Sequence, residues 1–155
     1  MSGYNGENKH VKALIAKHDG KVMRYRDLTY EAKCAYSYYM AIDGTAWGTP
    51  KNEVRMKELV AYHEKMHPNF KVGIVQVPMG AFCDAIHANS DYDHASFAAY
   101  HEWYVQNCYN EDNGKSVWPV ILNYFDDELL QDGWHRFHSY VERKLKTIPC
   151  LYFLT

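Results

Sequence analysis

Five residues near the carboxyl-terminal end, Asp132-Gly133-Trp134-His135-Arg136, have the side chains and the spacing of an anion-binding turn. They separate a short apolar pair from an amphipathic run, so they mark the entry to a helix. Backbone N–H groups at a helix start attract anions, and glycine allows close backbone approach. Arg136 adds a planar fork of donors suited to phosphate, and His135 can donate further hydrogen bonds. A simpler interpretation stays open: Asp132 caps the helix, Gly133 turns the chain and Arg136 lies in solvent.

A second motif, HEKMH at residues 63–67, matches the H-E-x-x-H pattern of zinc hydrolases. On a helix this pattern places His63 and His67 on one face, with Glu64 as the general base. Pro68 follows directly, so the helix is expected to end where a zinc-hydrolase helix continues. The alternative is a solvated helix end, where histidine is favoured near the negative end of the dipole. The chain offers several third ligands and nothing selects one among them: His87, His94 and Glu102.

The remaining histidines, cysteines and tyrosines indicate packing more than chemistry. His94 and His101 can share a helical face, which is more typical of a surface or groove than of a metal pair. A cluster of three tyrosines at 36, 38 and 39 has the rings to stack bases, but core packing is the expected role. No Cys-x-x-Cys pair occurs, so we expect neither a zinc ribbon nor a redox pair, but reduced and mostly buried thiols. The four cysteines stand at positions 34, 83, 108 and 150.

The elements that must position these residues fall into two parts. In residues 1–69 apolar periodicity predicts helices over 9–19, 29–42 and 52–67, the last of them mostly polar. From residue 70 the pattern changes to strands at 70–77, 117–125, 128–131 and 148–153, with a short helix around 82–86. Asp93 is expected to cap a helix that carries Phe97, Tyr100, Tyr104 and Cys108, and another helix begins near Trp134. The predicted fold class is α+β, with a helical N-terminal extension over 1–69 and a mixed domain over 70–155.

The segment from Trp118 to Phe153, WPVILNYFDDELLQDGWHRFHSYVERKLKTIPCLYF, resembles the closing part of the ParB/sulfiredoxin-like superfamily. Members of this family have a β-hairpin that ends in a (D/G)-G-x-(H/R)-R turn, followed by a helix and a strand entered through I/V-P. Residues 132–136 match the turn and Thr147-Ile148-Pro149 matches the strand entry. The resemblance covers about the last 85 residues, since the strand near 72–77 and the helix near 94–107 stand in the order of that fold. It implies a small mixed sheet with helices.

The resemblance also implies a ligand, because this family binds nucleotide phosphates of CTP or ATP at the turn. By position, Gly133, His135 and Arg136 would contact phosphate and Asp132 would shape the turn. Trp134 stands where sulfiredoxins have a reactive cysteine, so sulfinic-acid chemistry is not expected. The chain also lacks the helix-turn-helix that follows in partition proteins and a second arginine-rich phosphate motif. A segregation clamp and nucleotide hydrolysis are therefore not expected, and the nuclease or kinase labels of some relatives need a catalytic base that cannot be identified.

Composition limits the class of protein. The 155 residues, 47% hydrophobic and 23% charged, suit a globular chain. A net charge of −2, from 17 basic and 19 acidic side chains, gives no sign of a nucleic-acid coat, although residues 143–146, RKLK, form a local basic patch. No apolar run of about 18 residues and no apolar signal core occurs, so we expect neither a transmembrane helix nor membrane partners. We expect a cytoplasmic location.

Three hypotheses follow. The first is a protein that binds a nucleotide or phosphorylated ligand at residues 132–136, with CTP or ATP and Mg²⁺ as the implied cofactors and with phosphoryl-transfer or phosphodiester chemistry if it is an enzyme. The second is a non-enzymatic protein of a phage or other mobile element, which reuses the scaffold to block or regulate a host protein or nucleic-acid complex. The third is a zinc hydrolase that uses His63, Glu64 and His67.

Overall fold

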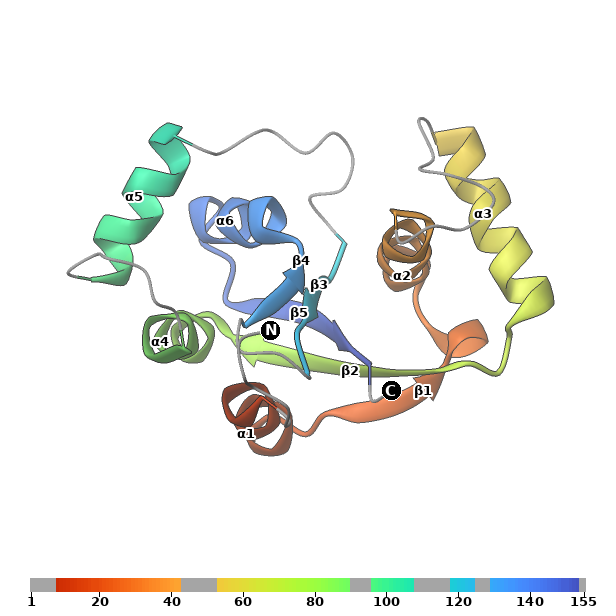
Figure 1. Ribbon diagram of the computed structural model, residues 1–155, viewed down its shortest axis with the longest axis horizontal. Helices are drawn as coiled ribbons and strands as arrows, with labels where there is room; N and C mark the ends of the chain where they lie inside the picture. Colours follow the sequence, from red (N-terminus) through yellow and green to blue (C-terminus); the bar gives the residue numbers. More distant parts are fainter. Residues whose placement is uncertain (1–7, 43–52, 90–95, 108–117, 125–128, 154–155) are drawn as a thin grey trace, which may run out of the picture.

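The computed structural model describes residues 8–42, 53–89, 96–107, 118–124 and 129–153. These residues form six α-helices and a five-stranded mixed sheet, so the protein is α+β (Figure 1). In chain order the elements are α1 (Lys9–Lys17), β1 (Lys21–Arg24), a 3₁₀ turn (Tyr25–Asp27), α2 (Tyr30–Ile42), α3 (Glu53–Met66), β2 (Lys71–Pro78), α4 (Met79–Asn89), α5 (Phe97–Asn107), β3 (Val120–Leu122), β4 (Leu130–Asp132), α6 (Trp134–Glu142) and β5 (Thr147–Tyr152).

The strand order in the sheet is β1-β2-β5-β3-β4. Neighbouring strands are antiparallel except β3 and β5, which are parallel and pair Val120 with Cys150. The last strand of the chain therefore lies at the centre of the sheet, between β2 and β3. Its burial fits this position, because four of its six residues are buried.

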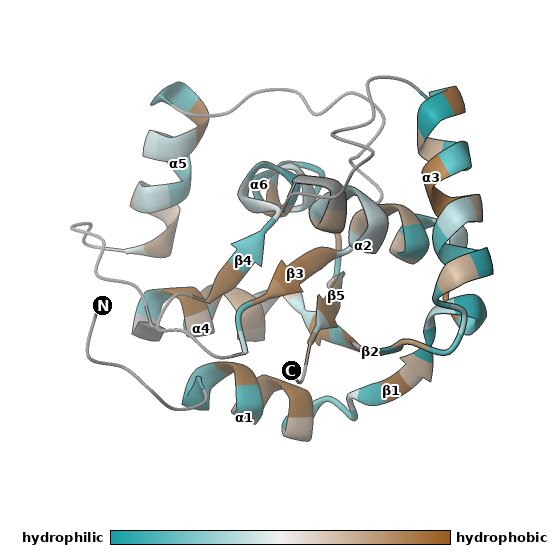
Figure 2. Ribbon diagram, turned by 45° about the vertical axis from the view of Figure 1, so that its right-hand side comes forward, coloured by the Kyte–Doolittle hydropathy of each residue, from teal (hydrophilic) through white to brown (hydrophobic). Residues whose placement is uncertain are grey.

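Apolar side chains project from both faces of the sheet and form two cores. The first core joins α1, α4 and α6 to one face, where Val75 and Val77 of β2 point. The second core joins α2 and α3 to the opposite face, where Val72 of β2 points and Ile74 packs. This division follows from the alternation of side chains along a strand. In Figure 2 the central strands are the most hydrophobic part of the ribbon, as expected for a sheet covered on both faces.

The sequence predictions of helices agree with the structure to within a few residues, whereas the strands show larger differences. The strand predicted over 117–125 extends only over Val120–Leu122 among the described residues, and the return strand lies at Leu130–Asp132. Asp93 and Cys108 lie outside the described residues, and within them the side chain of Ser96 accepts a hydrogen bond from the N–H of Ala99 at the start of α5.

The prediction that residues 1–69 are helical is wrong for residues 21–24, which form the edge strand β1. Three of its four side chains are exposed, so no apolar alternation marks it in the sequence. Pairing with β2, in the register Lys21 with Ile74, is what makes it a strand. The first 69 residues therefore contribute to the same sheet as the rest of the chain and to both cores. No helix in the described ranges has the length and apolarity needed to cross a membrane.

Candidate functional site

The turn predicted to bind an anion lies where β4 ends and α6 begins. Gly133 is the N-cap residue of α6, with φ of 100° and ψ of 23°, a conformation that only glycine adopts without strain. A Cβ atom at this position would lie 3.0 Å from Nη2 of Arg136 and 3.1 Å from Cγ1 of Val120. Since glycine has no side chain, the first turn of α6 has no side-chain cap. The backbone at this helix start is therefore arranged as the sequence predicted.

Arg136 is buried, with 3% of its surface exposed. Its Nη2 donates a hydrogen bond of 3.2 Å to Oδ2 of Asp132, and its guanidinium lies 5.9 Å from the ring centre of Trp118. Its Nε is buried and has no partner among the described residues. The simpler interpretation of the turn is thus wrong on two points: Arg136 does not lie in solvent, and Asp132 pairs with Arg136 while Gly133 occupies the cap position.

His135 faces a different neighbour. Its Nδ1 is hydrogen-bonded to the hydroxyl of Tyr104 on α5, at 3.2 Å. The structure therefore brings Asp132, Gly133 and Arg136 together at the start of α6, and it connects His135 to α5.

A cluster of histidines between α5 and α6 lies next to this contact and was not found from the sequence. His101 and His138 share a hydrogen bond of 2.7 Å between their Nδ1 atoms, and Nε2 of His101 lies 3.0 Å from Oε2 of Glu142. The ring of Tyr104 is stacked on His138, with ring centres 3.7 Å apart. The signal available in the sequence was the spacing of His135, His138 and Glu142 along one helix, but their partners on α5 could not be assigned.

His138 is the buried member of this histidine cluster, with none of its surface exposed. Burial, followed by the neighbouring His101 and His135, lowers the pKa of His138 from 6.5 to about 3. Its Nε2 is buried without a partner in the described part of the chain. Since His138 is neutral in the folded protein near pH 7, the hydrogen bond to His101 needs no charge on His138.

In the described part of the chain, the HEKMH motif takes part in packing between helices. His63 is buried, and its Nδ1 is hydrogen-bonded at 2.7 Å to the hydroxyl of Ser37, which also contacts the Tyr25 hydroxyl at 2.7 Å. Burial, and then the nearby His67, lower the pKa of His63. Glu64 pairs with Lys33. No group of three His, Cys, Asp or Glu side chains that could hold a metal ion occurs among the described residues; His94 lies outside them. The motif instead ties α3 to α2.

The cysteines and the tyrosine cluster have packing roles. Cys34 and Cys150 are buried free thiols and Cys83 is half-buried. Burial raises the pKa of Cys34 and of Cys83 to about 11 and raises that of Cys150 as well. Raised values keep all three as unreactive thiols near pH 7. The clustered tyrosine rings pack against Phe70, Phe153 and Trp118, as predicted.

Three comparisons with known proteins found no match for this chain. No protein-family model, no curated protein and no solved structure matches it.

Proposed function

We propose that the turn at residues 132–136 binds a phosphate group of a nucleotide or of another phosphorylated ligand. The observation that supports this proposal best is the buried guanidinium of Arg136. Arginine has five N–H donors, and the side-chain hydrogen bond found for Arg136 among the described residues is the one to Asp132. A buried donor without a partner is costly, and a buried charge more so. A phosphate at the turn would supply the acceptors that this guanidinium lacks.

The backbone of the same turn favours an anion independently of Arg136. A helix start carries N–H groups without intrahelical partners and the positive end of the dipole. Gly133 leaves the first turn of α6 without a side-chain cap. An anion at this position would therefore contact both the backbone N–H groups of the first turn of α6 and the guanidinium of Arg136, the third residue of that helix.

Asp132 bears on the form of the ligand. Its carboxylate is 30% exposed and pairs with Arg136, so it positions the guanidinium but also repels an incoming phosphate. A divalent cation on the phosphate reduces this repulsion, because it offsets the negative charge of the ligand. CTP or ATP with Mg²⁺ is therefore the form of nucleotide that we expect to bind.

Any reaction at this turn would belong to phosphoryl-transfer or phosphodiester chemistry. The turn contains the imidazole of His135, whose Nδ1 is hydrogen-bonded to the Tyr104 hydroxyl. The proposal concerns binding and requires no catalytic step.

Thermal shift in the presence of CTP, ATP or inorganic phosphate, each with and without Mg²⁺, tests this proposal. A ligand at 100 times its dissociation constant stabilises the folded state by about 2.7 kcal/mol. Arg136→Gln should abolish the shift, whereas Arg143→Gln, at the exposed end of the same helix, should retain it. Asp132→Asn should strengthen binding of phosphate without Mg²⁺, because the repelling carboxylate is gone. Equal shifts for Arg136→Gln and wild type, or no shift with any of these ligands, would exclude the site.

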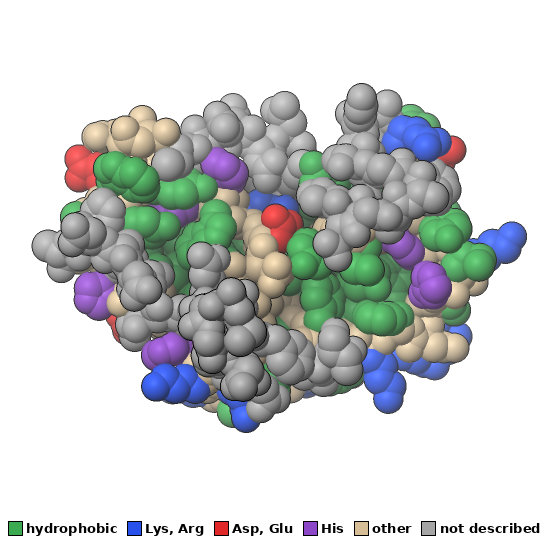
Figure 3. All heavy atoms as spheres, viewed as in Figure 1, with side chains coloured by type: hydrophobic (Ala, Val, Ile, Leu, Met, Phe, Trp, Pro, Cys, Tyr) green, Lys and Arg blue, Asp and Glu red, His purple; other side chains and the backbone are tan. Residues whose placement is uncertain are grey.

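A second candidate function is binding to another protein, such as a host protein blocked by a mobile-element product. The observation in its favour is a group of exposed apolar side chains on and after α3: Val54 (69% exposed), Tyr62 (38%), Met66 (53%) and Phe70 (41%). Tyr62 and Met66 are four residues apart and so share one face of α3, and exposed apolar groups that lie together often mark interaction surfaces. On the face shown in Figure 3, the Lys and Arg side chains lie mostly near the rim, with one basic group beside an acidic one near the middle, so this view shows no continuous basic surface for nucleic acid.

Affinity capture from host lysate tests the second candidate. A protein retained by the wild type should be lost with the double variant Tyr62→Ser, Met66→Ser. It should be retained by Val22→Ser, which removes an exposed apolar side chain from β1. Recovery of a clean monomer without any bound protein would count against this function.

A further inference from the structure

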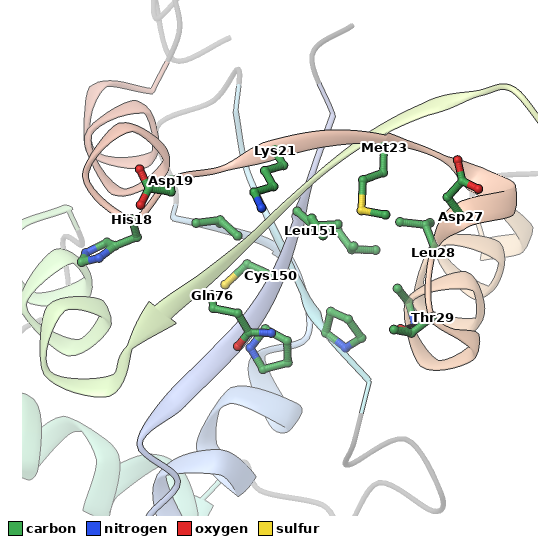
Figure 4. Close-up of a pocket in the computed structure, with 15 residues that line it drawn as sticks. His18, Asp19, Lys21, Met23, Asp27, Leu28, Thr29, Gln76, Cys150 and Leu151 are labelled. Atoms are coloured by element: carbon green, nitrogen blue, oxygen red, sulfur yellow. Dashed lines mark hydrogen bonds between the residues drawn. The ribbon is translucent and has the colours of Figure 1, made fainter.

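A cavity of about 410 Å³ lies on the sheet face of the second core. Its floor is made by cross-strand neighbours that point to the same side: Lys21 pairs with Ile74, Ile74 with Leu151, and Gln76 with Pro149. The start of α2 covers one end of this surface, through Leu28 and Ala32, which belong to the second core. The rest of the floor, toward Gln76, is left as a hollow (Figure 4), and Pro149 also lines it. The cavity is thus a part of the sheet face that α2 does not cover.

The walls of this cavity are mostly apolar, but a few polar groups converge on it. His18 also lines the cavity, but its Nε2 is buried and is not exposed to it. The Lys21 ammonium makes no hydrogen bond or ion pair with any described residue, and its side chain reaches toward the middle of the lining in Figure 4. Asp27, at one end of the cavity, is already paired with Arg24 at 3.0 Å. An apolar hollow of this size with a few convergent polar groups has the character of a small-molecule site.

We propose that this cavity binds a small amphipathic anion, namely an apolar body that carries one carboxylate. The apolar body would lie on Ile74, Leu151 and the proline rings, and Lys21 would pair with the carboxylate. The Lys21 ammonium has no acceptor among the described residues, so a carboxylate head adds a charge pair that an apolar body alone would not make.

Charge limits the ligand to one negative group. Asp19 and Asp27 also line the cavity, so a polyanion such as a nucleotide would meet two carboxylates against the single ammonium of Lys21. This site is therefore distinct in chemistry from the turn at residues 132–136, and either proposal can fail without the other.

Titration with octanoate, 1-octanol and octylamine tests the proposal, because the three probes share an apolar body and differ in the charge of the head. Binding is followed by NMR through the methyl groups of Met23, Ile74 and Leu151, which line the cavity. Octanoate should bind about tenfold more tightly than octanol, as expected for one hydrogen-bonded charge pair at a partly exposed site. Octylamine should bind more weakly than octanol.

Two variants and one control make the result specific. Lys21→Met should remove the preference for octanoate and leave octanol binding within about twofold, because the apolar stem is kept. Gln76→Phe, at an exposed lining position, should weaken all three probes by filling the hollow. Lys71→Met removes the same charge from β2 outside the cavity and should change nothing. Methyl resonances that do not move with millimolar octanoate, an unchanged preference in Lys21→Met, or octylamine binding as tightly as octanoate would each overturn the proposal.

Discussion

Protonation of His138 should destabilise the protein in mild acid. Its pKa is about 3 in the folded protein, against 6.5 for an ordinary histidine, because the ring is fully buried and lies beside His101 and His135. A group with a lowered folded pKa binds fewer protons in the folded state than in the unfolded state. The contribution of His138 to the free energy of unfolding is therefore present in full above pH 6.5 and is lost progressively as the pH falls from 6.5 toward 3.

The magnitude follows from linkage. Below pH 6.5 the unfolded chain gains a proton at this position that the folded chain does not, which costs about 1.4 kcal/mol for each pH unit. Between about pH 7.5 and pH 5 the free energy of unfolding should thus fall by about 2 kcal/mol through His138 alone. Since a whole domain has only about 5–15 kcal/mol of stability, this loss is large enough to measure.

Urea denaturation of the wild type and of His138→Gln at several pH values between 5 and 7.5 measures this contribution. The variant should be less stable near neutral pH, because it loses the stacking on Tyr104 and the contact with His101. Its stability should nevertheless depend less on pH than that of the wild type, by about 2 kcal/mol over this range. His87→Gln, at an exposed position of α4, controls for the other histidines and should retain the wild-type pH dependence. Parallel pH profiles for wild type and His138→Gln would refute the reasoning.

Two further predictions concern packing and hydrogen bonding. Gly73→Ala should destabilise the fold by about 2 kcal/mol or more, because the added Cβ would lie 2.1 Å from the Tyr152 ring. Gly80→Ala in α4 is the control, because a Cβ there meets no atom within 4 Å. This control variant should be neutral or more stable by up to about 1 kcal/mol. Equal thermal midpoints for the two variants would contradict this. Ser37→Ala should cost about 1–3 kcal/mol in urea denaturation, because buried His63 and a tyrosine hydroxyl lose their shared partner; a cost as small as that of an exposed serine would show that this bond contributes little.

The sequence by itself determined the local elements and the location of the turn. Helical periodicity located the helices, since a stripe of apolar residues must face a core. The Asp-Gly pair marked the entry to α6 because a glycine is needed where φ is positive, and Gly133 has that conformation. Tyrosine packing was also predictable, since large rings are buried more often than they are left as binding surfaces.

Only the tertiary structure decided which of these residues meet. Nothing in the four residues of β1 indicates a strand until β2 offers its hydrogen-bonding groups, and β5 takes the centre of the sheet although it comes last in the chain. His101 and His138 are 37 positions apart, so no local pattern could pair them. Arg136 was expected at the turn, but its burial against Trp118 depends on packing between α6 and the segment that leads into β3. Local periodicity determines which side chains face the core. The contacts between those side chains depend on how elements distant in the sequence pack together. The chemistry of both proposed sites depends on those contacts.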